Sequence, residues 1–112
     1  MDLRNVVVAI SGASGSIYGI RVLQMLRQVE DVNSHLVITP SAKSTIGVET
    51  EYSVSEIEEL ADEVHSARDI GASIASGSFK TVGMIVAPCS IKTLSAIAVS
   101  YTHLRAHETP MY

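Results

Sequence analysis

The chain has 112 residues, a formal net charge of −4 and one cysteine, Cys89. Hydrophobic residues make up 46% and charged residues 18%, which excludes a disordered chain, and the negative balance argues against a nucleic-acid groove. A lone thiol is typical of a reducing compartment, so we expect a cytoplasmic protein. No signal peptide and no membrane span are expected, because no apolar run has the required pattern or length. At this length one domain is the limit. A chain this apolar must bury surface in an oligomer or belong to something larger.

A strand, a helix and a second strand are predicted in the first forty residues. Residues 5–10 form a β-branched run, the pattern of a strand buried on both faces, and residues 11–16 are small turn formers. Apolar residues recur every three positions over residues 17–29, which indicates an amphipathic helix. Residues 34–39 read as the second strand. Such a βαβ unit is parallel and right-handed.

Two further helices are expected next. Thr39 supplies a capping hydroxyl and Pro40 the first helical position of a helix that ends near Val48. Residues 55–58 have capping-box spacing, and apolar residues follow at helical intervals as far as Val64. The acidic residues of this segment are interpreted as a solvated helix face rather than a partner-docking surface.

The last part of the chain contains one more strand. Residues 66–79 are predicted to be a short helix and a loop, residues 81–87 a third buried strand, and residues 91–99 a helix. Residues 100–112 show neither helical nor strand periodicity. The predicted fold is a doubly wound α/β sheet of order 2-1-3.

Each predicted strand ends in small polar residues and a helix start, which places three loops at the carboxyl edge of the sheet. They contain Ser14, Thr39, and the segment from Ser90 to Thr93 with Lys92. Helix N-termini, hydroxyls and a lysine at this edge suit a phosphate group. The loop around Gly12 fits neither the P-loop pattern nor the dinucleotide fingerprint, so a mononucleotide such as FMN fits better. The alternative for that loop is a tight turn with no ligand.

Four separated segments resemble the flavin prenyltransferase family of the UbiX type, in the same order along the chain. The resemblance covers about residues 3 to 100 and rests on residues 10–19 (Ile-Ser-Gly-Ala-Ser-Gly-Ser-Ile-Tyr-Gly), 48–50 (Val-Glu-Thr), 72–79 (Ala-Ser-Ile-Ala-Ser-Gly-Ser-Phe) and 88–95 (Pro-Cys-Ser-Ile-Lys-Thr-Leu-Ser).

The resemblance implies a flavodoxin-like, Rossmann-type three-layer fold and a homo-oligomeric enzyme. It implies reduced FMN as acceptor of a dimethylallyl group from dimethylallyl phosphate, joined to flavin N5 and C6. The product, prenylated FMN, would serve a UbiD-type decarboxylase, as in ubiquinone biosynthesis. No metal is implied, because Arg and Lys can stabilise the leaving phosphate.

The resemblance also assigns roles to individual residues. It places Ser14 near flavin N5 and Glu49 in the lining of the active site, as the catalytic candidates. FMN would be bound by a first loop, by Thr39 and by a second loop, that is by Gly12, Ala13, Ser14, Thr39, Ser90, Ile91, Lys92 and Thr93.

The chain departs from the family pattern at its end. Family members are longer, and their later part supplies an Arg for FMN and an Arg, Lys and Tyr set for the prenyl phosphate. We therefore expect residues 1–99 to be the FMN-binding part of an incomplete flavoprotein domain that is inactive by itself. Residues 100–112 are expected to be a foreign or rearranged tail, with an internal deletion as the alternative.

Two other functions remain open. A related FMN-dependent cysteine decarboxylase would share the fold and the FMN loops, and a non-catalytic FMN-binding module would bind flavin without chemistry.

Cys89 is interpreted as a small strand-end residue rather than a nucleophile. His35 is expected to be structural or exposed. His103 and His107 have an i, i+4 spacing that is insufficient alone for zinc.

Overall fold

The computed structural model describes residues 3–70, 81–91 and 95. The predicted helix and loop of residues 66–79 and the predicted helix of residues 91–99 are therefore described only in part. The expected tail, residues 100–112, lies outside the described residues, as do Lys92 and Thr93.

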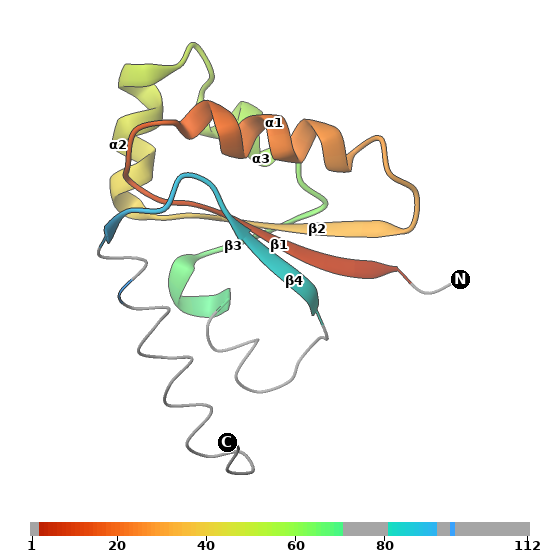
Figure 1. Ribbon diagram of the computed structural model, residues 1–112. Coiled ribbons are helices and arrows are strands. Elements are labelled where there is room, and N and C mark those ends of the chain that lie inside the picture. Colours follow the sequence, from red (N-terminus) through yellow and green to blue (C-terminus); the bar gives the residue numbers. More distant parts are fainter. Residues whose placement is uncertain (1–2, 71–80, 92–94, 96–112) are drawn as a thin grey trace, which may run out of the picture.

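Four parallel strands form the sheet in the order β3-β2-β1-β4 (Figure 1). They are β1 (Arg4–Ile10), β2 (Val32–Ile38), β3 (Glu63–His65) and β4 (Thr81–Val86). The three strands predicted from the sequence are β1, β2 and β4, and their order confirms the doubly wound arrangement. The chain enters β2 through α1, so the β1–β2 pair has the parallel crossover that a βαβ unit requires.

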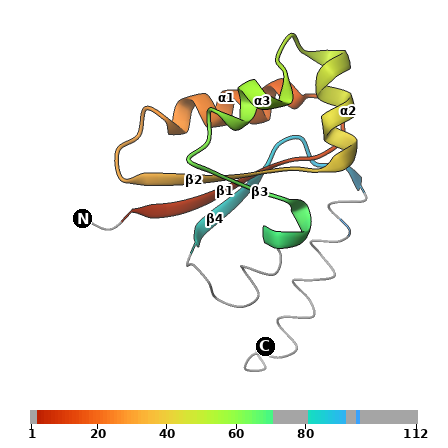
Figure 2. The ribbon, with the colours of Figure 1, turned by 180° about the vertical axis from the view of Figure 1, so that it is seen from behind.

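Three helices cover one face of the sheet (Figures 1 and 2). They are α1 (Ser16–Leu26), α2 (Pro40–Glu49) and α3 (Val54–Glu58). Their apolar side chains and those of the strands form the main core, whose buried residues are Val8, Ile10, Ile20, Leu23, Leu36, Ile38, Ala42, Ile46 and Ile57. This face of the sheet is thus closed within the described residues.

The opposite face carries a smaller apolar cluster. Val7 and Val37 are buried there against Ile70, with Ala9 packed beside them. Ile70 belongs to a helical turn at residues 67–70, which lies beneath the sheet in Figure 1. This turn is the part of the third layer that the described residues contain.

The segment after α2 differs from its prediction. The helix cap is Ser53 rather than Ser55: the Ser53 hydroxyl accepts from the Glu56 N–H, and the Glu56 carboxylate accepts from the Ser53 N–H. Both serines have an acidic residue three positions on, so the spacing alone does not choose between them. The helix ends at Glu58, and Val64 lies in β3 instead of on a helix, because Glu63–His65 pair with β2.

The fourth strand lies at an edge of the described sheet. Val82, Met84 and Ile85 on β4 are 65%, 46% and 38% exposed. Within the described residues β4 therefore forms an open apolar edge of the sheet. None of the described helices has the length and apolar character needed to cross a membrane.

Candidate functional site

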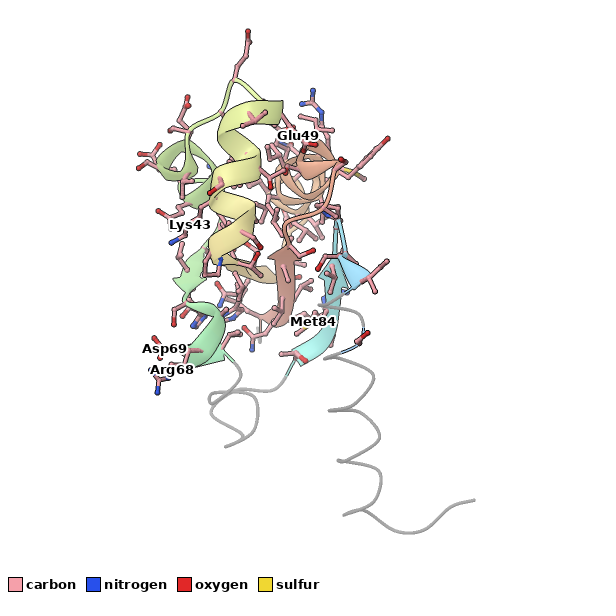
Figure 3. All side chains as sticks on the ribbon, turned by 90° about the vertical axis from the view of Figure 1, so that its left-hand side faces the viewer. Lys43, Glu49, Arg68, Asp69 and Met84 are labelled. Atoms are coloured by element: carbon pink, nitrogen blue, oxygen red, sulfur yellow. The ribbon has the colours of Figure 1, made fainter. Side chains whose placement is uncertain are left out.

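Three loops meet at the carboxyl edge of the sheet, as the strand order predicts. β1 ends at Ile10, paired with Ile38 at the end of β2, while Ala9 pairs with Val86 at the end of β4. Figure 3 views the molecule from this edge and shows Glu49 at the end of α2, beside α1. The loop after β1 thus lies between the loops that follow its two neighbours, which is the switch point of a doubly wound sheet.

Ser11 fastens the first loop to the loop after β4. Its buried hydroxyl donates to the Pro88 carbonyl oxygen at 2.6 Å and accepts from the Ser90 N–H at 2.8 Å. The Ser11 N–H donates to the same Pro88 oxygen at 3.2 Å. In the sequence, Ser11 is recognisable only as one of the small turn formers of residues 11–16. The small residue directly after a buried strand was the available signal, but its partner lies 79 positions away.

Two glycines allow the first loop to pack closely. A Cβ at Gly12 would lie 2.5 Å from the Ser41 hydroxyl oxygen, so only glycine lets this loop approach the start of α2. Gly15, the residue before α1, has φ 105°, a left-handed conformation that disfavours other residues. Ser14, between them, is exposed, whereas Gly12 and Ala13 are half-buried.

Glu49 binds the N-terminus of α1, where the N-cap residue Gly15 provides no side-chain hydrogen bond. Its carboxylate oxygen accepts from the N–H groups of Gly15 and Ser16 at 3.2 and 3.3 Å. The Ser16 N–H is the main cause of a lowered pKa of Glu49, and the Gly15 N–H and the Ser14 and Ser16 hydroxyls lower it further. Glu49 is therefore an oriented, ionised carboxylate above the first loop.

This contact bears on where a phosphate could bind. The first N–H groups of α1 hold Glu49, so an anion at this helix end must displace that carboxylate or bind to the other two loops. The exposed hydroxyl of Ser41 lies 3.5 Å from the Thr39 hydroxyl and offers one such donor. A phosphate site at this edge remains a prediction.

Thr39 acts first as a helix cap. Its hydroxyl accepts from the Ala42 N–H at 3.2 Å, and Pro40 occupies the first helical position, as the sequence predicts. α2 continues to Glu49, one residue beyond the predicted end. This extra residue places the Glu49 carboxylate against α1.

The third loop turns at a cis peptide bond between Ala87 and Pro88. Cys89 is an exposed free thiol whose sulfur lies 3.6 Å from the Ser90 carbonyl oxygen. Ser90 is tied to Ser11, and Ile91 is 85% exposed. The structure therefore brings together Gly12, Ala13, Ser14, Thr39, Glu49 and Ser90 at one edge.

Comparison with known proteins identifies the family of the chain. The family model described as Flavoprotein matches residues 1–100. The chain is 56% identical over 100 residues to the flavin prenyltransferase UbiX of Escherichia coli K12, and 58% identical over 96 residues to that of Thauera aromatica. These alignments cover 89% and 86% of the chain, but 53% and 49% of the relatives. The chain thus spans about half the length of the curated relatives it matches.

Solved structures show the same fold. AnUbiX (PadA1), crystallised with FMN and dimethylallyl pyrophosphate, matches with a TM-score of 0.80 at 47% identity. That match covers 88% of this chain and 52% of the other. A dodecameric FMN-dependent UbiX-like decarboxylase from Escherichia coli O157:H7 matches with a TM-score of 0.79 at 46% identity, covering 87% and 52%.

Proposed function

Because the chain belongs to the Flavoprotein family, we propose that it is the FMN-binding part of a flavin prenyltransferase of the UbiX type. The observation that carries the proposal is the 56% identity over 100 residues to a UbiX enzyme, in a chain whose three strand-end loops converge. The similar structure with FMN and dimethylallyl pyrophosphate supports both the cofactor and the class of donor.

The residues at the carboxyl edge fit a flavin mononucleotide. Gly12 and Ala13 add little side-chain bulk to the first loop, and the hydroxyls of Ser14, Thr39 and Ser90 are hydrogen-bonding groups on the three loops. Lys92 and Thr93 continue the third loop in sequence and complete the proposed binding set with Ile91. Reduced FMN, when bound, supplies the nucleophilic flavin ring that accepts the prenyl group.

Ser14 and Glu49 are the proposed catalytic residues. The exposed Ser14 hydroxyl is positioned by the loop that Ser11 fixes, and can hydrogen-bond a flavin nitrogen at this edge. Glu49 is held ionised and oriented by the Gly15 and Ser16 N–H groups, so it presents a fixed negative charge above the loop. That charge would stabilise a developing allyl cation.

The similar solved structures support a proposed donor and a proposed assembly. We propose dimethylallyl phosphate or its pyrophosphate as donor, the latter being bound in the similar structure. A UbiD-type decarboxylase in the cytoplasm is proposed as recipient of the prenylated FMN on the family resemblance alone. The dodecameric relative supports a homo-oligomer for the full-length enzyme. Since the chain spans about half of its relatives, we propose that the complete reaction also needs the region that they have beyond the match.

An anaerobic assay tests this proposal. The 112-residue chain, and the same chain joined after residue 99 to the C-terminal half of the E. coli UbiX relative, are incubated with reduced FMN and either donor. Flavin products are identified by mass spectrometry. We expect a prenylated flavin only from the joined protein, and much less of it from its Ser14→Ala and Glu49→Gln variants.

Other outcomes separate the alternatives. Flavin binding without product by the joined protein would favour a non-catalytic module. Oxidative decarboxylation of a cysteinyl substrate would favour the cysteine decarboxylase. Efficient prenylation by the 112-residue chain itself would overturn the proposed need for the second half.

A further inference from the structure

A cluster of polar side chains lies on the other face of the sheet, away from the proposed flavin site. Asn33 and His35 on β2 and Glu63 and His65 on β3 project from this face, because His35 pairs with Glu63 and Val37 with His65 in the parallel ladder. Asn5 on β1 completes the group. Asn5 and Asn33 lie near the starts of their strands, His35 at the middle of β2, and the other two on the short edge strand, whereas the loops of the proposed flavin site follow the strand ends.

His35 is the buried centre of this cluster, with 2% of its surface exposed. Its Nε2 lies 2.9 Å from the Asn5 side-chain oxygen and 3.1 Å from the Asn33 amide nitrogen. Because the Asn33 amide donates to the Asn5 oxygen and to Glu63, this arrangement favours the tautomer with the ring proton on Nε2, donating to Asn5. The Nδ1 lone pair then faces Nε2 of His65 at 2.9 Å. Burial lowers the pKa of His35, which keeps the ring neutral. A neutral histidine whose second nitrogen donates to a fixed oxygen has the arrangement usual for a metal ligand.

Two carboxylates surround this histidine pair with negative charge. Glu63 Oε2 lies 3.6 Å from His35 Nε2 and accepts from the Asn33 amide at 2.6 Å. Asp62 accepts from the Ser34 N–H at 2.8 Å, which holds the start of β3 against β2. A cation is therefore favoured at this place, on two strands that are fixed relative to each other.

We propose that His35, Glu63 and His65 bind a divalent transition-metal ion, with Zn²⁺ as the best-suited member of the class. Each residue offers one ligand atom, and these three atoms lie within 4.8 Å of one another. Two imidazoles and one carboxylate form a ligand set that zinc accepts, with the fourth position open to water. This site goes beyond the proposed flavin chemistry and does not depend on it.

Binding requires the two outer ligands to adjust. Zinc–nitrogen bonds of about 2.0–2.1 Å place tetrahedral ligand atoms roughly 3.3 Å apart, so the His35 and His65 nitrogens, 2.9 Å apart, must separate slightly, while the widest-spaced ligand atoms of the set must come closer than 4.8 Å. The Glu63 side chain is 51% exposed and His65 is half-buried, so both can rotate while His35 stays fixed. His65 then carries its proton on Nδ1 and ligates through Nε2, and no net proton is lost from either ring.

Titration of the full chain with zinc tests the site. Calorimetry measures zinc binding, and the visible spectrum of Co²⁺, used as a substitute ion, reports the coordination geometry. The chain carries His103, His107 and Cys89 as other possible ligands, so all measurements use the H103Q/H107Q/C89S background. We expect one ion per chain, a raised Tm with zinc and a tetrahedral Co²⁺ spectrum. His65→Ala and Glu63→Gln should each weaken binding at least about tenfold, and Asn5→Ala should weaken it by about 10–100-fold.

Glu51→Gln is the matched control for Glu63→Gln, because Glu51 is exposed and lies in the connection between α2 and α3. It should bind zinc like the background protein. Zinc binding that survives His65→Ala unchanged, or a folded background protein that binds no zinc, overturns the proposal. FMN binding is measured on the same samples. A loss of zinc binding with FMN binding retained would contradict the metal site alone, and a loss of FMN binding with zinc binding retained would contradict the proposed function alone.

Discussion

Two side chains connect the loops of the candidate site, and neither does so in a way that sequence spacing reveals. Ser11 joins the loop after β1 to the loop after β4, and Glu49 joins the end of α2 to the start of α1. Glu49 entered the candidate site only through the family resemblance. Residue spacing cannot reveal the contact of Glu49 with Gly15 and Ser16, because the end of α2 meets the start of α1 only when both helices pack on the same face of the sheet.

Removing the Ser11 hydroxyl should loosen both loops. In Ser11→Ala, the Pro88 carbonyl and the Ser90 N–H lose their buried hydroxyl partner, so we expect a loss of about 1–3 kcal/mol in the free energy of unfolding and weaker FMN binding. Urea unfolding and FMN fluorescence titration measure the two effects. Ser44→Ala, at an exposed position of α2, is the control and should retain both properties. Unchanged stability in Ser11→Ala would refute the role of this hydroxyl.

The Glu49 contact should make stability depend on pH. Because the pKa of Glu49 is lowered in the folded chain, its carboxylate stabilises the fold above the pKa of the unfolded state. That contribution is lost as the pH falls through the lowered folded-state pKa. We expect Glu49→Gln to be less stable than the parent at neutral pH, with the difference vanishing in acid. Unfolding from pH 7 downward measures it, and a difference independent of pH would contradict it. Glu51→Gln should match the parent throughout.

At the scale of the elements, α1 packs closely on the end of β4 through Gly19. A Cβ at Gly19 would clash with the Ala87 carbonyl oxygen and approach the Ile10 side chain at 2.7 Å. Gly19→Ala should therefore cost about 1–3 kcal/mol in the free energy of unfolding, as overpacking does. Gly47, exposed on α2, has no atom within 4 Å of such a Cβ, so Gly47→Ala should stabilise by about 0.5–1 kcal/mol. Thermal or urea unfolding compares the two, and equal effects would contradict the packing argument.

The strands and helices with strong periodicity were predictable, and the short ones were not. β1, β2, β4 and α1 follow from β-branched runs and a three-residue apolar repeat, and α2 from Thr39 and Pro40. β3 is three residues long and is held by pairing with β2 and by the Asp62 contact to Ser34, neither of which leaves a local pattern. The acidic run was predicted as one solvated face, yet Asp62 and Glu63 hold polar partners on β2.

At the scale of the molecule, the open edge at β4 should govern behaviour in solution. Val82 and Met84 are exposed there on a strand whose outer side has no partner strand within the described sheet. We expect the isolated chain to self-associate as its concentration rises, because such an edge pairs with other chains. Sedimentation velocity should show this, and Val82→Lys should reduce it. A parent chain that stays monomeric at all concentrations and melts in one sharp transition would contradict the expectation.

The apolar composition of the chain has a structural explanation at this scale. One face of the sheet is closed by three helices, while the other carries only the turn at residues 67–70 within the described residues. Toward their carboxyl ends β1 and β2 are nevertheless apolar on this face too, through Val7, Ala9 and Val37, as strands covered on both sides require, whereas their first halves and β3 carry the polar cluster around His35. The relatives, about twice as long, have the additional residues that such a cover needs.

The central claim is that the loops at the carboxyl edge bind FMN, and titration of FMN with the folded 112-residue chain tests it most directly. Flavin fluorescence should change saturably with one FMN per chain. Gly12→Val, whose side chain would collide with Ser41, should bind at least about tenfold more weakly, whereas Gly47→Ala should bind like the parent. A chain that is folded by circular dichroism and leaves FMN fluorescence unchanged at all concentrations would contradict the account.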